Sequence, residues 1–138
     1  MTREMERDTN SYPSSEQGNN PVLTIDLKKK RLRLYKQSLK AIGNPEYVQF
    51  LVDPVTHKLV IRSSDEKDWC AQRIYWTILN DKGQCCEFYS KDLLEMMRLH
   101  FFPSDKLRSY RVSGATANRK SLIVFDLNES VPIADEEA

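Results

Sequence analysis

Alternating apolar and polar residues mark the first folded segments of this chain. Residues 22–27 predict a first strand, and residues 31–34 read Arg-Leu-Arg-Leu, the alternation typical of a half-buried strand. The spacing then lengthens, with Leu39 and Ile42 three positions apart and a glycine directly after them. A short helix is therefore expected over residues 36–42.

Farther along, runs rich in β-branched and aromatic residues are separated by turn sequences, which predicts three hairpins. Their strands are residues 47–52 with 59–62, 73–79 with 84–89, and 109–114 with 121–127. Ser90 is suited to cap a second helix over residues 91–100, whose apolar side chains recur at helical spacing.

The pattern as a whole predicts one α+β domain over residues 23–127, mostly antiparallel hairpins with two short helices. A chain of 138 residues has the length of one typical domain. Residues 1–22 hold almost no apolar periodicity and are expected to form a disordered arm. Residues 128–138 are expected to be an acidic tail.

Two stretches share the order strand, helix, hairpin: the units 24–63 and 84–127, separated by the predicted strand 73–79. Tyr35 and Tyr89 fall in register between them. This repeat predicts a duplicated β-α-β-β unit folded as a single-chain pseudo-dimer barrel. The alternative is that this order recurs by chance in a small α+β domain.

A run of basic residues crosses the predicted strand and first helix. Seven of the 21 basic residues lie in this run, with no acidic residue among them, which leaves 14 basic against 20 acidic residues elsewhere. They are Lys28, Lys29, Lys30, Arg31, Arg33, Lys36 and Lys40. Cations on ordered structure meet a polyanion in fixed geometry, so the run predicts nucleic-acid binding. The competing interpretation is a solvated strand edge, where lysine suppresses aggregation.

Residues 31–62 combine a strand, a short helix ending in Ile-Gly, a nearby proline and a hydrophobic hairpin ending in Val-Ile-Arg. This order resembles the AbrB/SpoVT family of bacterial DNA-binding domains, in which the MraZ proteins carry two units in tandem. The resemblance implies a swapped-hairpin barrel, either a homodimer or a monomeric pseudo-dimer. It also implies DNA contact through Arg31, Arg33, Lys36 and Lys40, with Lys28–Lys30 directly before them.

The chain departs from the family pattern in three places, the first of which is a first hairpin with longer strands. Tyr35 stands where the family commonly has a proline, and residues 64–84 are additional. The second unit is more acidic over the equivalent strand and helix, which predicts a poor DNA surface there. Its acidic residues are Glu87, Asp92 and Glu95.

Other binding chemistry has weaker signals. Aromatic side chains could stack on single-stranded bases. The candidates are Tyr35, Trp69, Tyr75 and Trp76. Tyr75 and Trp76 would point to opposite faces of the predicted strand, so at least one belongs to the core. The cysteines and histidines lack metal-ligand spacing, and no cofactor is expected. They are Cys70, Cys85, Cys86, His57 and His100.

The sequence therefore predicts a bacterial DNA-binding transcriptional regulator or antitoxin-like protein. The lysines would contact phosphate, and Arg31 and Arg33 would read base edges. An odd number of cysteines and no signal-like N-terminus predict a cytoplasmic protein without a membrane partner.

Two alternatives stay open. The first is a protein-interaction module without enzymatic activity, docking an acidic partner or adding a strand. The second is an enzyme with an unrecognised site, although no glycine-rich loop or catalytic motif marks one.

Overall fold

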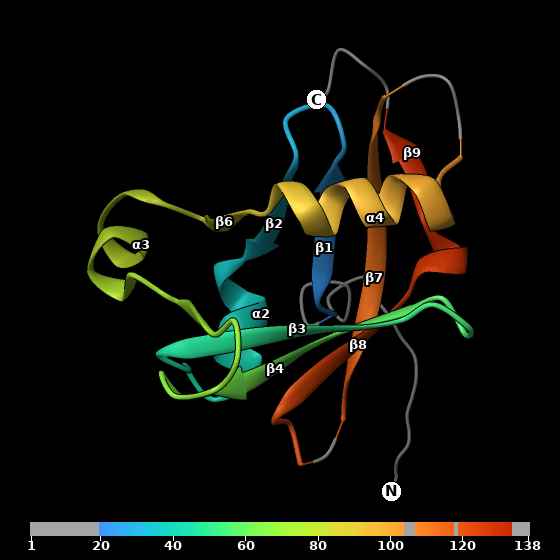
Figure 1. The fold of residues 1–138 in the computed structure, drawn as a ribbon. Helices are drawn as coiled ribbons and strands as arrows, with labels where there is room; N and C mark the ends of the chain where they lie inside the picture. Colours follow the sequence, from blue (N-terminus) through green and yellow to red (C-terminus); the bar gives the residue numbers. More distant parts are fainter. Residues whose placement is uncertain (1–19, 104–106, 118, 134–138) are drawn as a thin grey trace, which may run out of the picture.

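The computed structural model describes residues 20–103, 107–117 and 119–133, and Figure 1 shows their arrangement. Within these residues, nine antiparallel strands form a nearly closed, barrel-like sheet accompanied by three short α-helices. The predicted α+β class, built mostly from antiparallel strands, is confirmed.

The strands follow in the order β5-β3-β4-β8-β7-β1-β2-β6, and β9 pairs with β7 beside this path. They are β1 (Val22–Asp26), β2 (Arg31–Tyr35), β3 (Tyr47–Asp53), β4 (Lys58–Ser64), β5 (Gln72–Arg73), β6 (Cys85–Tyr89), β7 (Ser109–Ala117), β8 (Leu122–Asp126) and β9 (Val131–Ile133). The helices are α2 (Lys36–Ala41), α3 (Trp76–Lys82) and α4 (Lys91–Phe101), with a 3-10 turn η2 (Leu127–Glu129) before β9.

Most of the predicted elements are present within a few residues of their expected bounds. The hairpins β3–β4 and β7–β8 form as expected, and so do α2 and α4. Gly43 adopts a left-handed φ of 92° just beyond α2, where a side chain would be strained. Ser90 caps α4, since its Oγ accepts a hydrogen bond from Leu93 N at 3.4 Å.

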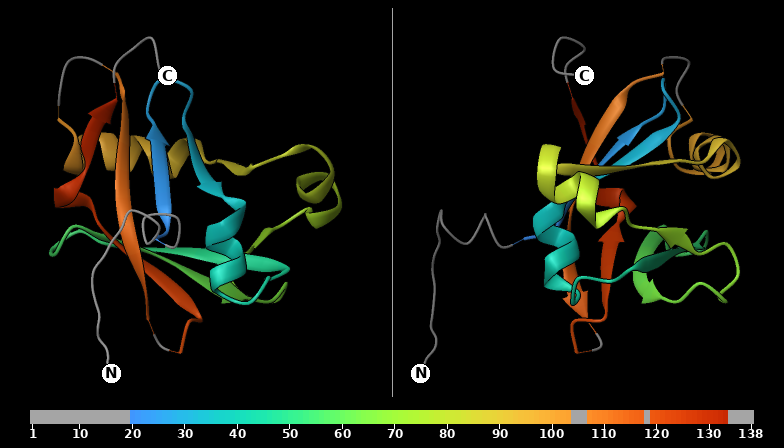
Figure 2. Two further views of the ribbon diagram at one scale, coloured as in Figure 1. Left: turned by 180° about the vertical axis from the view of Figure 1, so that it is seen from behind. Right: turned by 90° about the vertical axis from the view of Figure 1, so that its left-hand side faces the viewer.

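The core lies between the inner faces of the curved sheet and α4. Leu23, Ile25, Leu32 and Leu34 alternate along β1 and β2 and are fully buried. Seen from the side, α4 lies on one side of β1 and β2, while α2 and α3 lie toward the other (Figure 2). The remaining positions of β2, namely 31, 33 and 35, therefore face outward, and this outer face carries the candidate site.

The predicted hairpin of residues 73–79 with 84–89 is wrong. Most of its first strand is helix α3, and β6 pairs instead with β2, which lies far earlier in the chain. Burial explains the difference: Ile74 and Leu79 are buried, whereas Ile78 is 63% exposed. No strand alternation produces this pattern, so tertiary packing overrides the β-propensity of the segment.

The ends of the domain differ from their predicted bounds. Residues 1–19 and 134–138 lie outside the described residues, so the predicted arm and acidic tail can be compared only at their inner ends. Val22 already belongs to β1, and the first part of the predicted tail forms η2 and β9. An edge strand tolerates Pro132, which a central strand would exclude, and a run of three residues is too short to show alternation.

Equivalent strands of the two predicted units pair with each other. β2 and β6 are antiparallel, so that Tyr35 and Tyr89 lie at opposite ends of one ladder. β4 and β8 are also antiparallel, and each belongs to a hairpin of its own unit. A pseudo-dimer would require this exchange. Within the described residues β1, β5 and α3 have no counterpart in the repeat, and the duplication stays a prediction.

Candidate nucleic-acid interface

The first cations of the basic run lie in the turn between β1 and β2. Lys28 and Lys29 are exposed, and Lys30 is half-buried with a left-handed φ of 56°. Asp26 fixes the turn, because its Oδ1 accepts a hydrogen bond from Lys29 N at 3.0 Å. The turn therefore presents Lys28 and Lys29 to solvent at one end of the sheet.

Arg31, on the outer face of β2, is largely enclosed by carboxylates. Its Nε lies 3.1 Å from Asp26 Oδ2 and its Nη1 lies 3.0 Å from Glu87 Oε2, and its side chain is 13% exposed. Burial opposes the charge, but Tyr89, Glu87 and Asp26 together raise the pKa of Arg31. Arg31 thus acts as a charged link between β1, β2 and β6.

Arg33 shares one of these carboxylates but is more open, with a side chain 40% exposed. Its Nε lies 3.3 Å from Glu87 Oε2, as an ion pair without hydrogen-bond geometry. The other oxygen of Glu87 accepts a hydrogen bond from Tyr89 Oη at 3.0 Å. Glu87 is therefore shared by both guanidinium groups, and together with Asp26 it offsets their two charges, so this part of the face has no net charge.

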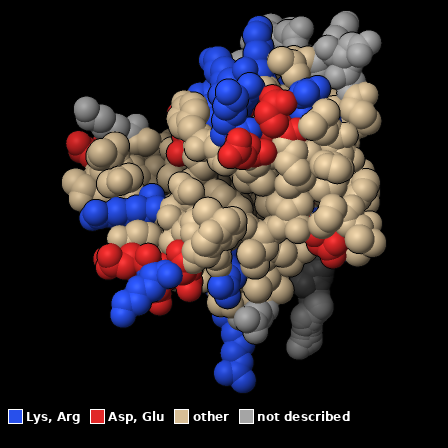
Figure 3. All heavy atoms as spheres, viewed as in Figure 1, with Lys and Arg blue, Asp and Glu red and all other residues tan. Residues whose placement is uncertain are grey.

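A third acidic residue, Glu95 on α4, pairs with one cation of the turn. Lys30 Nζ lies 3.2 Å from Glu95 Oε2, and Arg98 Nη2 donates to Glu95 Oε1 at 3.1 Å. Hydrogen bonds from Arg98 and then from Lys30 lower the pKa of Glu95. Figure 3 shows basic side chains gathered over this end of the sheet with acidic ones beside them.

The last two cations of the run lie one turn apart on α2, on the same side of the helix. Lys36 is half-buried, and its backbone N donates to Gln84 O at 2.7 Å. Lys40 is exposed in the last turn, where a cation is favourable to the helix dipole. Both lie beyond the end of β2 that is farther from the β1–β2 turn.

Four cations of the run have no ion pair with the residues that the structure describes. These unpaired lysines are Lys28, Lys29, Lys36 and Lys40. They flank β2, whose five residues span roughly 16 Å at the usual rise of a strand. The seven predicted site residues therefore form a track over the β1–β2 turn, β2 and α2, with Arg31 and Arg33 in its middle, rather than one compact patch.

The four aromatic candidates have different surroundings. Trp69, Tyr75 and Tyr35 are 79%, 60% and 40% exposed, respectively. Trp76 is half-buried, and its Nε1 donates to Pro45 O at 2.7 Å. Of the pair at 75 and 76, only the tyrosine is therefore free to stack on a ligand.

A small hollow lies between α3 and β6. Its volume is about 250 Å³, and most of its walls are apolar. The lining residues are Tyr75, Ile78, Leu79, Gly83, Cys85, Cys86 and Glu87. The sequence offered no signal for this hollow, because the segment of α3 was predicted as a strand.

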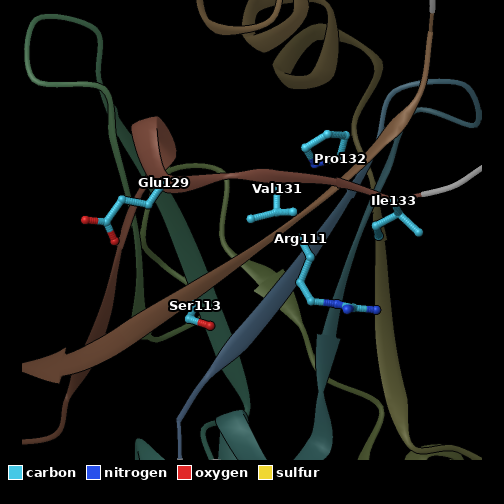
Figure 4. Close-up of a pocket in the computed structure, with 6 residues that line it drawn as sticks. All are labelled: Arg111, Ser113, Glu129, Val131, Pro132 and Ile133. Carbon is cyan, nitrogen blue, oxygen red and sulfur yellow. The ribbon is translucent and has the colours of Figure 1, made fainter.

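A larger hollow of about 390 Å³ lies between β7 and the segment from η2 to β9 (Figure 4). Figure 4 shows that Arg111 and Glu129 point in opposite directions from its rim, so these charges do not converge on one point. Arg111 instead belongs to the outer face, in one cross-strand row with Thr24 and Arg33. Sequence reasoning missed Arg111, although its polar position on a predicted strand was a signal for an outward side chain.

In the described part of the chain, no group of three or more His, Cys, Asp or Glu side chains is placed to hold a metal ion. Cys70 is exposed, and burial raises the pKa of Cys86 to about 11. None of the described helices combines the length and the apolar character that crossing a membrane requires.

Comparison with known proteins found no matching family model, no matching curated protein and no matching solved structure.

Proposed function

We propose that this protein binds DNA through the phosphate backbone, in a regulatory or antitoxin-like role. The observation that supports this function is the set of four unpaired lysines, held on the β1–β2 turn and on α2 at the two ends of β2. Lysines on ordered elements can release counterions from phosphates without the entropy cost of first ordering a loop.

The arginines between these lysines have separate roles in the proposal. Arg31 positions the strand, because Asp26 and Glu87 already occupy its guanidinium. Arg33 is the residue proposed to contact a base edge or a phosphate, since it is the more exposed of the two. Arg111 extends the same outer face by two strands.

The experiment is a salt titration of binding to a random-sequence DNA duplex. Affinity is expected to fall steeply with salt. The slope of log affinity against log salt should decrease by about 0.9 for each phosphate contact removed. The variants are Lys28→Ala/Lys29→Ala and Lys36→Ala/Lys40→Ala.

Lys67→Ala is the matched control, because Lys67 is an exposed lysine in the loop after β4. It should leave the slope unchanged. Absence of binding to any nucleic acid at low salt would refute the proposed function. An equal effect of Lys67→Ala would show that DNA is attracted by charge in general, without a defined binding site.

A second candidate is a protein-interaction module, and the free edge of β6 favours it. Lys36 N bonds to Gln84 O, so alternate residues 86 and 88 turn their backbone groups toward β2. The backbone groups of Cys85 and Glu87 then face the other edge, where β6 has no partner strand among the described residues. A strand from a partner protein could add there. Protection of these amides from hydrogen exchange by a partner protein, with no effect of DNA, would favour this candidate.

A further inference from the structure

Two exposed tyrosines border the same cysteine on the outer face. Tyr35 is the register partner of Cys85 across β2 and β6, and partners in a ladder point to the same face. Tyr75 lines the hollow between α3 and β6 together with Cys85. Segments that are distant in sequence thus place Tyr75 in the wall of a small apolar hollow and Tyr35 across the ladder from Cys85, another residue of that wall.

Cations are interleaved with these rings. Arg73 lies over the ring of Tyr75, with 5.2 Å from its guanidinium carbon to the ring centroid. Arg33 contacts Cys85, and Lys36 directly follows Tyr35 in the chain. Glu87 is the only acidic residue lining the hollow within the described part of the chain, and Arg31 and Arg33 already neutralise it.

We propose that the surface formed by this hollow, by Tyr75 in its wall and by Tyr35 opposite Cys85 binds unpaired bases of a single-stranded nucleic acid. The inference rests on the proposed function and specifies the form of nucleic acid that the site prefers. Aromatic rings beside a positive track are the usual platform for single strands, because every base has a face that can stack. A duplex keeps its base faces inside the stack, so it cannot use these rings.

The size and position of the hollow agree with this ligand. At about 250 Å³ it is smaller than an ordinary small-molecule pocket of roughly 300–1,000 Å³, so it suits one base rather than a whole cofactor. The single-stranded nucleic acid would run along β2 toward α2. Its phosphates would lie on the unpaired lysines Lys36 and Lys40, and one base would stack on each tyrosine. A partner protein could also cover the apolar wall at Ile78, and the test separates that outcome.

The test compares three probes by fluorescence anisotropy at low salt. They are an oligothymidylate, the same backbone with abasic sites in place of all but one base, and a duplex of equal length. Oligothymidylate should bind about tenfold or more tightly than the abasic strand, which carries the same phosphates but almost no rings to stack. The affinity for oligouridylate, compared with that for oligothymidylate, tells whether the site prefers single-stranded RNA or single-stranded DNA.

Substitution of the rings identifies the site. Tyr35→Leu and Tyr75→Leu should each weaken oligothymidylate binding by about tenfold and change duplex binding by less than about twofold. Tyr35→Phe and Tyr75→Phe keep a ring and should retain binding. Trp69→Leu is the matched control, because Trp69 is the most exposed aromatic side chain of the four candidates and does not line the hollow. Equal melting temperatures verify that each variant is folded.

The outcomes separate this inference from the function beneath it. Equal affinity for the abasic strand and oligothymidylate, or unchanged binding by both leucine variants, would overturn the single-strand site. If the lysine variants still flatten the salt dependence in that case, the proposed function stands. Loss of a protein partner in the Ile78→Lys variant, with oligothymidylate binding intact, would assign the hollow to protein docking and also overturn the inference.

Discussion

Arg31 on β2 and Glu87 on β6 form an ion pair of 3.0 Å between Nη1 and Oε2. The two residues come from different predicted units, a basic first unit and an acidic second one. Glu95 of the second unit likewise pairs with Lys30 of the first. The fold therefore compensates part of the charge that the sequence concentrates in one run, and the cations that stay unpaired lie at the two ends of β2.

Replacing Arg31 with alanine is expected to lower the free energy of unfolding by about 2–4 kcal/mol. The change would leave the carboxylate of Asp26, whose side chain is only 6% exposed, without its guanidinium partner. Arg33→Ala should cost no more than about 1 kcal/mol, because the Arg33 side chain is 40% exposed. Urea unfolding measures both, and an equal cost would contradict the structural role of Arg31.

This order of stabilities also determines how binding data are interpreted. Weaker DNA binding by Arg31→Ala would reflect a disturbed strand, whereas the same loss in Arg33→Ala would indicate contact with the ligand. Binding experiments on Arg31 therefore need the unfolding curve of the same variant as a control.

Elements with complete local signals were predictable from sequence. The helix α4 has its cap at Ser90 and its apolar spacing within a few residues, and the hairpin β3–β4 has its turn between two apolar runs. The helix α3 was not predictable, because Ile74 and Leu79 are buried against parts of the fold that are distant in sequence. β9 was missed because three residues around Pro132 show no alternation.

The candidate site was predictable as a charge run but not as a surface. Alternation placed Arg31 and Arg33 on one face correctly. Their pairing with Glu87 depends on β6 lying beside β2, and the sequence predicted another partner for that strand. The placement of Tyr35 opposite Cys85 and of Tyr75 in the same hollow as Cys85 depends on that long-range ladder and on α3, so no local pattern could reveal it.

Gly114 faces Phe125 directly across β7 and β8, and a Cβ at this position would lie 2.7 Å from two ring carbons of Phe125. Gly114→Ala is therefore expected to lower the free energy of unfolding by about 1–3 kcal/mol. Phe125→Leu alone should cost about 1–3 kcal/mol, because it leaves a cavity in the core. The double variant should lose less stability than the sum of the two single variants, since leucine lacks the ring that clashes with the new Cβ.

Urea unfolding of the four proteins in this double-mutant cycle provides the measurement. Relief will be incomplete, because the new Cβ also approaches the backbone oxygen of Val124 at 2.7 Å. Strictly additive costs would mean that the strand shifts away from the ring, and the close packing described here would not limit the substitution.

The three thiols are expected to react with iodoacetamide in the order of their exposure and ionisation. Cys70 is exposed and should react first. Burial raises the pKa of Cys85, although Arg33 acts in the opposite direction, and burial raises the pKa of Cys86 to about 11. At about pH 8 only about one Cys86 in a thousand is then a thiolate, the reactive form. Mass spectrometry of tryptic peptides measures the rates, and in urea the three should converge.

Glu95 is expected to stabilise the contact between α4 and the β1–β2 turn in a manner that depends on pH. Hydrogen bonds from Arg98 and then Lys30 lower its pKa below the ordinary 4.5. A carboxyl group whose pKa is lowered by folding stabilises the folded state fully at pH values above its ordinary pKa. This stabilisation is lost as pH falls through the lowered pKa. The melting-temperature difference between the native protein and Glu95→Gln should therefore be constant above about pH 5 and shrink below it. Glu66→Gln, an exposed loop acid, is the control.

The same substitution separates stability from binding at neutral pH. Glu95→Gln releases Lys30 from its 3.2 Å ion pair and removes the negative charge that α4 presents to the β1–β2 turn. If the β1–β2 turn contacts phosphate, the variant should bind DNA about two- to threefold more tightly at low salt, even though it is less stable. This gain in affinity should disappear as the salt concentration rises, because salt screens the charges of the turn. A variant that loses both stability and affinity would show that Glu95 orders the turn for binding, and a gain that persists at high salt would exclude an electrostatic origin.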